Sequence, residues 1–166
     1  MEIRLLTEKD IDAWLAVRHR ALREHPDAFG RAIEEADTRE EWQQRFHSSE
    51  NGVEGFVLGA FAPELGGVIG CYRLRGLKSR HIAVIWGMYV TPELRRGGTG
   101  GALLDAAIAR ARDWGDVDHL VLDVVRHQTA AKNLYVSRGF VVIGCHPRAF
   151  KNGTSYYDED QMMLRL

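Results

Sequence analysis

The first part of the chain has apolar positions that predict a short strand followed by a helix. Residues 3–6 form a short apolar segment of the kind found in edge strands. Thr7 followed by Asp10 is typical of a cap that opens a helix, and Pro26 ends the helical pattern. Between these signals, apolar side chains recur in steps of three and four on one helix face: Ile11, Trp14, Leu15, Ala21 and Leu22.

The middle of the chain changes from helical to strand spacing. Residues 27–37 predict a loop or a short turn of helix. Thr38 with Glu41 caps a second helix, which carries Trp42, Arg45 and Phe46 at helical spacing. Residues 56–61 and 68–74 are apolar runs separated by proline and glycine, which predicts a hairpin with a loop longer than a tight turn.

The second half of the chain alternates between strands and helices. The run Ile82–Val90 is apolar on both faces and predicts a central strand, with Gly87 marking a bulge or a close backbone approach. Residues 102–114 predict a helix, 120–125 a β-branched strand and 129–138 a short helix stopped by glycine. The last two predicted strands are residues 140–144 and 161–166.

This order of elements predicts a single α/β domain with a mixed sheet over residues 1–166. Hydrophobic residues are 45% and charged residues 27% of the chain, so whole-chain disorder and coiled coil are excluded. The formal net charge is −1, from 22 Lys and Arg against 23 Asp and Glu. Such a balance gives no support for bulk binding to nucleic acid or to a membrane surface.

Cysteine content and the start of the chain predict a soluble, cytoplasmic protein. The two cysteines, Cys71 and Cys145, are too few for a disulfide scaffold and fit a reducing compartment, although they leave one disulfide open. The first four residues are charged and lack the apolar core of a signal peptide. The longest apolar run, Ile82–Val90, is about half of what a membrane span needs. We also predict no metal site.

Glycine is concentrated at one point of the chain. There are 17 glycines, and four of them lie within residues 97–101, between the predicted central strand and the next helix. A helix start leaves backbone N–H groups unpaired and carries partial positive charge. Glycines let this backbone approach an anion closely, and Arg95 and Arg96 add charged donors. This combination predicts an anion site, for which a pyrophosphate is the natural guest.

The two familiar phosphate-binding loops do not fit the spacing. A Walker A loop needs a Gly-Lys-Ser/Thr ending, and no lysine follows the glycines here. The dinucleotide-binding fingerprint needs a third glycine three residues after the second. If Gly98 and Gly100 are taken as the first two glycines, the third position is occupied by Leu103. A merely flexible turn accounts neither for the arginine pair nor for the helix that follows.

Two motifs resemble the GNAT superfamily of N-acetyltransferases. Arg95-x-x-Gly98-x-Gly100 is similar to the Q/R-x-x-G-x-G/A signature of that family, within residues 85–104, IWGMYVTPELRRGGTGGALL. Residues 128–140, QTAAKNLYVSRGF, resemble its N-x-x-A-x-x-L-Y-x-x-x-G-F block. The order of elements also agrees over nearly the whole chain. The resemblance implies a GNAT-like α/β fold: a mixed, mostly antiparallel central sheet flanked by helices.

The resemblance also implies acetyl-CoA as the cofactor, with coenzyme A as the product. It would lie in a V-shaped opening between the strands that end near Val90 and Val125. Its pantetheine arm would pair with the backbone of Met88, Tyr89 and Val90. Its pyrophosphate would bind to Arg95, Arg96, Gly97, Gly98, Thr99, Gly100 and Gly101. A primary amine would attack the thioester directly, without an acyl-enzyme, so catalysis would depend mainly on positioning and on polarising the carbonyl.

The second motif supplies the remaining site residues. Tyr135 matches the tyrosine that the family uses as general acid toward the departing thiolate, whereas the sequence alone favours a packed aromatic residue on a short helix. Gln128 replaces the usual asparagine, which puts its contact with the pantetheine in doubt. Asn133 is expected nearer the phosphates or the adenosine.

No motif fixes the general base or the acceptor site. Asp123 is the most unusual candidate base because a charge interrupts an apolar strand, although it could equally form a structural ion pair. The other candidate bases are His81, His127, Glu34 and Glu35. The acceptor side is expected among Phe29, Gly30, Tyr72, Trp86 and the segment Tyr156, Tyr157, Asp158 and Glu159.

Three functions therefore compete. The first is an N-acetyltransferase acting on an amine, which is either a small molecule or a protein amine. The second is a non-catalytic acyl-CoA-binding or sensing module of the same fold. The third is a nucleotide hydrolase that uses the glycine loop for ATP. The sequence leaves open the acceptor, the use of other acyl groups and the oligomeric state, although many relatives pair as homodimers.

Overall fold

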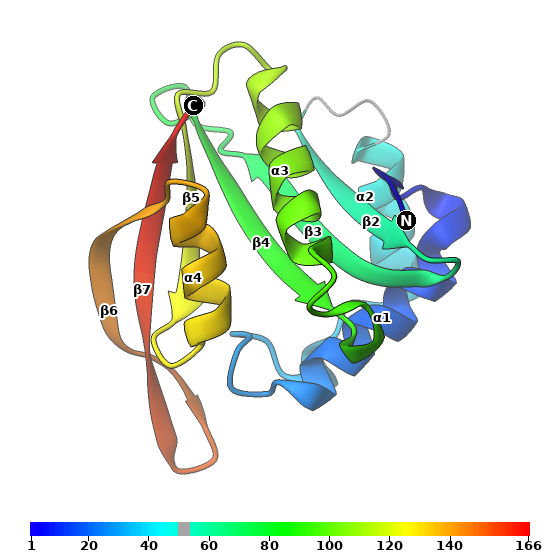
Figure 1. Cartoon of the computed structure of the whole chain (residues 1–166), viewed down its shortest axis with the longest axis horizontal. Coiled ribbons are helices and arrows are strands. Elements are labelled where there is room, and N and C mark those ends of the chain that lie inside the picture. Colours follow the sequence, from blue (N-terminus) through cyan, green and yellow to red (C-terminus); the bar gives the residue numbers. More distant parts are fainter. Residues whose placement is uncertain (50–53) are drawn as a thin grey trace.

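The computed structural model describes residues 1–49 and 54–166 and is built around one sheet (Figure 1). The strands are β1 (Glu2–Leu5), β2 (Gly55–Phe61), β3 (Leu65–Arg73), β4 (Ile82–Val90), β5 (His119–Val125), β6 (Val141–Asn152) and β7 (Ser155–Arg165). Their order is β1-β2-β3-β4-β5-β7-β6, and every neighbouring pair is antiparallel except β4 and β5. The predicted mixed, mostly antiparallel sheet is confirmed.

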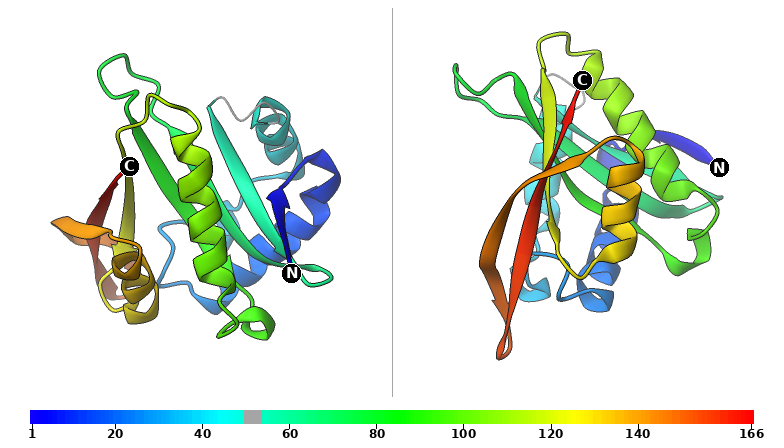
Figure 2. Two further views of the ribbon diagram at one scale, coloured as in Figure 1. Left: turned by 45° about the horizontal axis from the view of Figure 1, so that its top comes forward. Right: turned by 60° about the vertical axis from the view of Figure 1, so that its left-hand side comes forward.

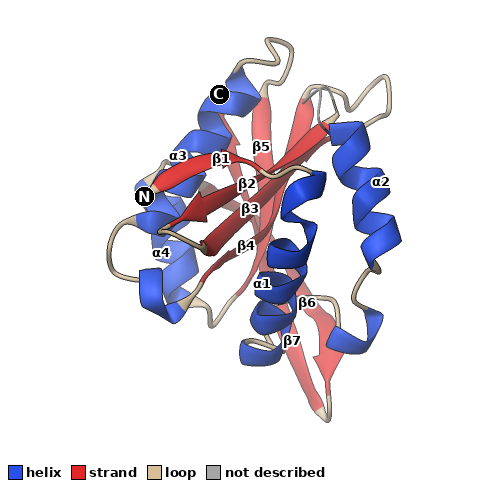
Figure 3. Cartoon of the chain, turned by 90° about the vertical axis from the view of Figure 1, so that its right-hand side faces the viewer, coloured by secondary structure: helices blue, strands red, loops and turns tan. Residues whose placement is uncertain are grey.

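Helices cover both faces of this sheet. They are α1 (Ile11–Glu24), α2 (Arg39–Ser49), α3 (Thr99–Arg112) and α4 (Thr129–Ser137). The pair α1 and α2 lies on one face, whereas α3 and α4 lie on the other (Figure 3). All four agree with the predicted helices to within a few residues. Among the described residues, no helix is both long and apolar enough to cross a lipid bilayer.

Each face of the sheet has its own apolar core. The core under α3 and α4 includes the inward residues of β5, such as Leu120 and Leu122. The core under α1 and α2 is aromatic: the ring centroids of Trp14 and Trp42 lie 4.6 Å apart, and Trp42 stacks on Trp86 at 5.8 Å. Both cysteines are free, with Cys71 buried and Cys145 exposed, so the disulfide that the sequence left open is absent.

The last hairpin is much longer than the sequence predicted. Strands expected over residues 140–144 and 161–166 extend through Val141–Asn152 and Ser155–Arg165, and the hairpin projects beyond the rest of the sheet (Figure 2). Strand β6 is an edge strand exposed over most of its length, so it lacks the apolar pattern by which buried strands are predicted. Its turn places Gly153 at a φ of 58°, which suits a two-residue hairpin loop.

Strands β4 and β5 pair over only a short length. Their register covers Ile82–Val84 against His119–Val121, and the two strands diverge toward their carboxyl ends (Figure 1). On its other side, β4 shifts register against β3 near Gly87, whose φ is 63°. The predicted bulge at Gly87 is therefore confirmed. Together the early end of pairing and the bulge leave the second half of β4 without a partner on the β5 side.

The aromatic core predicts a cost for any side chain at Gly70. A Cβ atom there would meet the indole of Trp86 at 2.1 Å, and this indole is held between Trp14 and Trp42. We expect Gly70→Ala to lower the free energy of unfolding by about 1–3 kcal/mol through overpacking, measured by urea denaturation. Gly144→Ala is the control, because none of the described heavy atoms lies within 4 Å of its Cβ position. Equal stability of the two variants would contradict this interpretation.

The helix cap near the N-terminus predicts acid sensitivity. Asp10 accepts hydrogen bonds from the guanidinium of Arg4 at 2.7 Å and from the backbone N–H of Thr7 at 2.9 Å. The Arg4 contact is the main reason that the pKa of Asp10 falls to about 2, with a smaller contribution from Thr7. A lowered carboxyl pKa contributes stability above the pKa of the unfolded chain, near 4, and this contribution is lost as pH falls through the folded value.

We therefore expect Asp10→Asn to destabilise the protein by about 2 kcal/mol at neutral pH. It should also flatten the fall in stability between about pH 4 and pH 2. Urea unfolding across this pH range measures both effects, with Asp113→Asn at an exposed position as control. An unchanged slope in Asp10→Asn would show that the cap does not cause the acid sensitivity.

Candidate active site

A cleft of about 620 Å³ lies where β4 and β5 diverge. It is lined from both faces of the sheet, because Met88 packs on the α3–α4 side and Trp86 on the α1–α2 side. On β5, the inward residue Leu122 and the exposed Asp123 both line it. The cleft therefore passes through the sheet and connects its two faces.

The glycine loop forms one end of this cleft. Gly98 is the N-terminal cap of α3 with a φ of 81°, and Arg96 also has a left-handed φ, 62°. Among the described residues, the backbone N–H groups of residues 96–101 have no hydrogen-bond acceptor. Unpaired N–H groups at a helix start carry partial positive charge. The loop is therefore shaped to bind an anion.

Two glycines of the loop are closely packed. A Cβ at Gly100 would lie 3.3 Å from side-chain atoms of both Met88 and Leu134, which themselves line the cleft. A Cβ at Gly101 would lie 2.2 Å from the guanidinium of Arg138, which also pairs with Asp105 at 3.1 Å. The sequence analysis missed Arg138, because only the tertiary structure brings the end of α4 against the start of α3.

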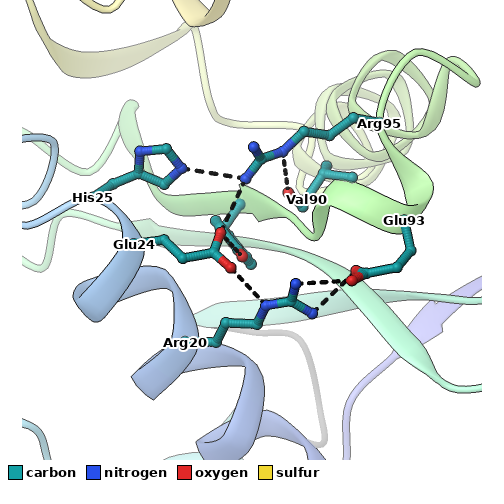
Figure 4. A network of polar contacts seen from close by, with 7 residues as sticks. Arg20, Glu24, His25, Val90, Glu93 and Arg95 are labelled. Atoms are coloured by element: carbon teal, nitrogen blue, oxygen red, sulfur yellow. Dashed lines mark hydrogen bonds and ion pairs between the residues drawn. The ribbon is translucent and has the colours of Figure 1, made fainter.

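Arg95 is held by residues from two other elements (Figure 4). Its Nε donates to the carbonyl oxygen of Val90 at 2.8 Å, and its terminal nitrogen lies 3.4 Å from Glu24 and 3.2 Å from His25. Arg20 bridges the same Glu24 to Glu93, at 2.7 and 2.8 Å. This network joins the end of α1 to the segment between β4 and the glycine loop.

Tyr89 lines the cleft, and its side chain packs on the α1–α2 side of the sheet. Its side chain is buried on the α1–α2 side, where the hydroxyl donates to Glu24 at 2.7 Å. Burial, followed by this hydrogen bond, raises the pKa of Tyr89 to about 12. The flanking Met88 and Val90 pack toward α3 and α4.

Tyr135 is buried on α4 and lines the cleft. Its side chain is 7% exposed, and its hydroxyl donates to the sulfur of Met88 at 3.6 Å. Burial raises the pKa of Tyr135 to about 12, so the phenol stays protonated at neutral pH. The position places a proton donor beside the unpaired half of β4.

The structure brings most of the predicted cofactor residues to this cleft. It is lined by Met88, Tyr89, Val90, Arg95, Arg96, Gly98, Thr99, Gly100, Gly101 and Gln128. Gly97 and Asn133 are exposed and lie outside its lining. No feature of the sequence distinguishes these two from their neighbours, because the direction in which a loop or helix residue points is set by packing.

Of the candidate bases, only Asp123 lines the cleft. On the neighbouring strand β7, Glu159 lies on the same face, and burial, followed by the charge of Asp123, raises its pKa. His127 instead pairs with Asp27 at 2.7 Å. The remaining candidates, His81, Glu34 and Glu35, lie outside the cleft lining.

Likewise, only some of the residues predicted for the acceptor site line the cleft. Phe29 and Trp86 line the cleft, joined by His25, which the sequence gave no reason to select. Gly30 lines a smaller cavity of about 170 Å³ next to it. Tyr72 is exposed, and residues 156–159 lie outside both cavities. Within the described ranges, no three His, Cys, Asp or Glu side chains form a metal-binding group.

Comparison with known proteins agrees with this geometry. Residues 14–140 match the model of the Acetyltransferase (GNAT) family. The mycothiol acetyltransferase of Salinispora arenicola is 31% identical over 141 residues, which are 82% of this chain but 43% of that protein. The chain thus spans less than half the length of this curated relative.

Solved structures show the same fold. A GNAT-family acetyltransferase from Streptococcus pneumoniae superposes with a TM-score of 0.90 at 24% identity, covering 99% of both chains. A protein from Salmonella typhimurium, solved with its cofactor acetyl-CoA, superposes with a TM-score of 0.86 at 21% identity, covering 99% of this chain and 93% of that one. With the family model spanning most of the chain, this protein belongs to the acetyltransferase (GNAT) family.

Proposed function

We propose that this protein transfers the acetyl group of acetyl-CoA to a primary amine by direct attack, without an acyl-enzyme. The observation that carries the proposal is the unpaired backbone of residues 96–101 at the mouth of a cleft that crosses the sheet. A diphosphate fits such a row of N–H donors at a helix start. Family membership adds acetyl transfer as the chemistry.

Two stretches of backbone would hold the cofactor. The pyrophosphate would accept hydrogen bonds from the loop, with Arg96 and Arg138 close enough to add positive charge. The pantetheine arm would pair with β4 beyond Val84, where β5 no longer provides a partner. An unpaired strand edge offers N–H and C=O groups to any extended chain.

The cleft also carries groups for proton transfer. When bound, acetyl-CoA supplies a thioester that an uncharged amine attacks, and coenzyme A departs as the thiol. Tyr135, with its raised pKa, is placed to donate the proton that the sulfur needs. Asp123, on the opposite wall, is placed to take the proton that the incoming ammonium must lose, and Glu159 beside it adds negative charge.

The acceptor is proposed to be a small molecule. The name of the curated relative, mycothiol acetyltransferase, favours such an acceptor over a protein amine. The cleft continues past Trp86 and Phe29 to the α1–α2 side, which gives the amine an entrance separate from the cofactor's. A cytoplasmic protein that binds neither nucleic acid nor membrane, with a homodimer left open, remains our expectation from the sequence.

The direct test measures coenzyme A binding by calorimetry and thiol release from acetyl-CoA with a panel of primary amines. Binding together with amine-dependent release supports the enzyme. Tight binding without release on a broad panel supports the non-catalytic acyl-CoA module instead. Displacement of coenzyme A by ATP would favour a nucleotide enzyme over both.

We expect Gly100→Val to abolish coenzyme A binding. Its Cβ would already touch Met88 and Leu134 at 3.3 Å, so the added methyl groups would fill the approach to the loop. We expect a rise in Kd of at least 100-fold, roughly the loss of two charge-assisted hydrogen bonds. Gly144→Val is the control, because Gly144 lies on β6 outside the cleft lining and none of the described heavy atoms lies within 4 Å of its Cβ position. Unchanged affinity in Gly100→Val would show that the loop is not the pyrophosphate site.

We expect Tyr135→Phe to lower kcat by roughly 100- to 1000-fold while leaving the Kd for coenzyme A nearly unchanged. The reason is that the phenylalanine keeps the buried ring but removes the proton donor. Steady-state kinetics and calorimetry measure the two quantities separately, with Tyr72→Phe at an exposed position as control. A large change in Kd with unchanged kcat would assign Tyr135 a packing role.

A further inference from the structure

The half of the cleft on the α1–α2 side lies between an indole and a carboxylate. Pairing between β4 and β5 ends at Val84 and Val121, and Trp86 and Asp123 each follow two residues later. Trp86 packs in the α1–α2 core, whereas Asp123 comes directly after Leu122, which packs in the other core. Because side chains alternate along a strand, Trp86 and Asp123 lie on the same face, at equivalent positions of the two diverging strands, and both line the cleft.

The aromatic walls of this half are held in place by other side chains. The ring of Trp86 is stacked on Trp42 and lies edge-on to Trp14, with ring centroids 5.8 and 6.1 Å apart. Phe29 lines both the cleft and the smaller cavity, and the guanidinium of Arg18, which lines neither, lies 5.0 Å from its ring centre. Surfaces that are fixed before binding lose little conformational entropy when a ligand packs on them.

Among the described residues, no unpaired cation lines this half of the cleft. Arg95 reaches it, but its terminal nitrogen lies 3.4 Å from Glu24 and its Nε donates to the carbonyl oxygen of Val90. A guanidinium only donates hydrogen bonds, so the ring nitrogen of His25 that faces Arg95 is an acceptor. The other cation in the cleft lining, Arg96, belongs to the glycine loop. An anionic group on the acceptor would therefore have no partner here.

The acidic wall offers a place for one ammonium group. Within the described part of the chain, Asp123 is the only carboxylate in the cleft lining. Glu159 on β7 lies on the same face and adds negative charge, but it lies outside the lining and opposite His146 in the register of β6 and β7. A second ammonium group on the acceptor would therefore find no carboxylate within the cleft.

We propose that the acceptor is an apolar primary amine that carries an aromatic ring and no anionic group. This inference rests on the proposed function and adds the substrate class. The ammonium group lies at Asp123, and the ring packs against Trp86 and Phe29. Such a ring gains apolar burial and ring–ring contacts, whereas the carboxylate of an amino acid would be desolvated without a partner.

The first test compares matched acceptors on the full chain, with thiol release from acetyl-CoA as readout. We expect the kcat/KM of phenethylamine to exceed that of methylamine roughly 10- to 100-fold, the effect of burying an aromatic ring. Phenylalaninol should exceed phenylalanine by a similar factor, because the two differ only in a hydroxymethyl group against an unpaired carboxylate. The diamine putrescine should be a poorer acceptor than phenethylamine.

A variant of the aromatic wall tests the position of the ring. Phe29→Ala should lower the preference for phenethylamine over methylamine roughly 10-fold, mainly through KM. Phe29→Leu keeps an apolar side chain and should retain part of the preference. Phe150→Ala is the matched control, because Phe150 lines the smaller cavity but not the cleft and stacks on Tyr157 at 5.1 Å. This control should keep the preference.

A second measurement does not depend on turnover. Phenethylamine is titrated by calorimetry into the protein saturated with coenzyme A, with which it forms a dead-end complex. We expect phenethylamine to bind roughly 10-fold more tightly than phenylalanine. Asp123→Asn should weaken the binding of phenethylamine roughly 10-fold, through the loss of a charge-assisted hydrogen bond. Asp113→Asn, at an exposed position, is the control.

The outcomes separate the two proposals. Faster acetylation of phenylalanine or putrescine than of phenethylamine, a preference that survives Phe29→Ala, or an equal loss in Phe150→Ala would each overturn the substrate class and leave the acetyltransferase proposal standing. If coenzyme A binds but no amine releases thiol, the acetyltransferase proposal is overturned. Calorimetry then still decides the substrate class, because equal or tighter binding of phenylalanine would overturn it.

Discussion

The end of backbone pairing between β4 and β5 is the constraint on which the rest of this structure depends. After Val84 the two strands lose register, and the bulge at Gly87 turns β4 further from its neighbour. A sheet interior normally satisfies every N–H and C=O group by pairing. Here the second half of β4 has an unpaired edge in the middle of the sheet. An extended ligand with N–H and C=O groups of its own is the natural partner for this edge.

This divergence also explains why the two ends of the site differ. The cleft reaches both faces of the sheet, so the α3–α4 side supplies unpaired N–H groups and the buried phenol of Tyr135, our proposed proton donor. The α1–α2 side supplies aromatic walls, with Trp86 held among the tryptophans of the second core. In the reaction we propose, cofactor and acceptor approach from opposite faces, and the reacting atoms meet within the sheet.

The charged side chains around the cleft differ in whether an opposite charge is paired with them. Arg20, Glu24, Glu93 and Arg95 balance one another and connect α1 to the strand that leads into the loop. Arg18, two residues before Arg20 on the same helix, makes no ion pair among the described residues and lies over the ring of Phe29. The compensated charges position the backbone that leads into the loop.

The sequence by itself determined the element order and the glycine loop, and it predicts an anion as the guest of that loop. These depend on local signals: apolar spacing, caps and a strand, loop and helix with glycines at fixed intervals. The long final hairpin escaped prediction because its edge strand is exposed and carries no apolar pattern. Only the tertiary structure decided which side chains meet across elements, such as Arg138 against Gly101 and Phe29 against Arg18. The reason is physical, since packing brings together residues from different elements. The spacing of residues along the chain does not indicate which of these residues will meet.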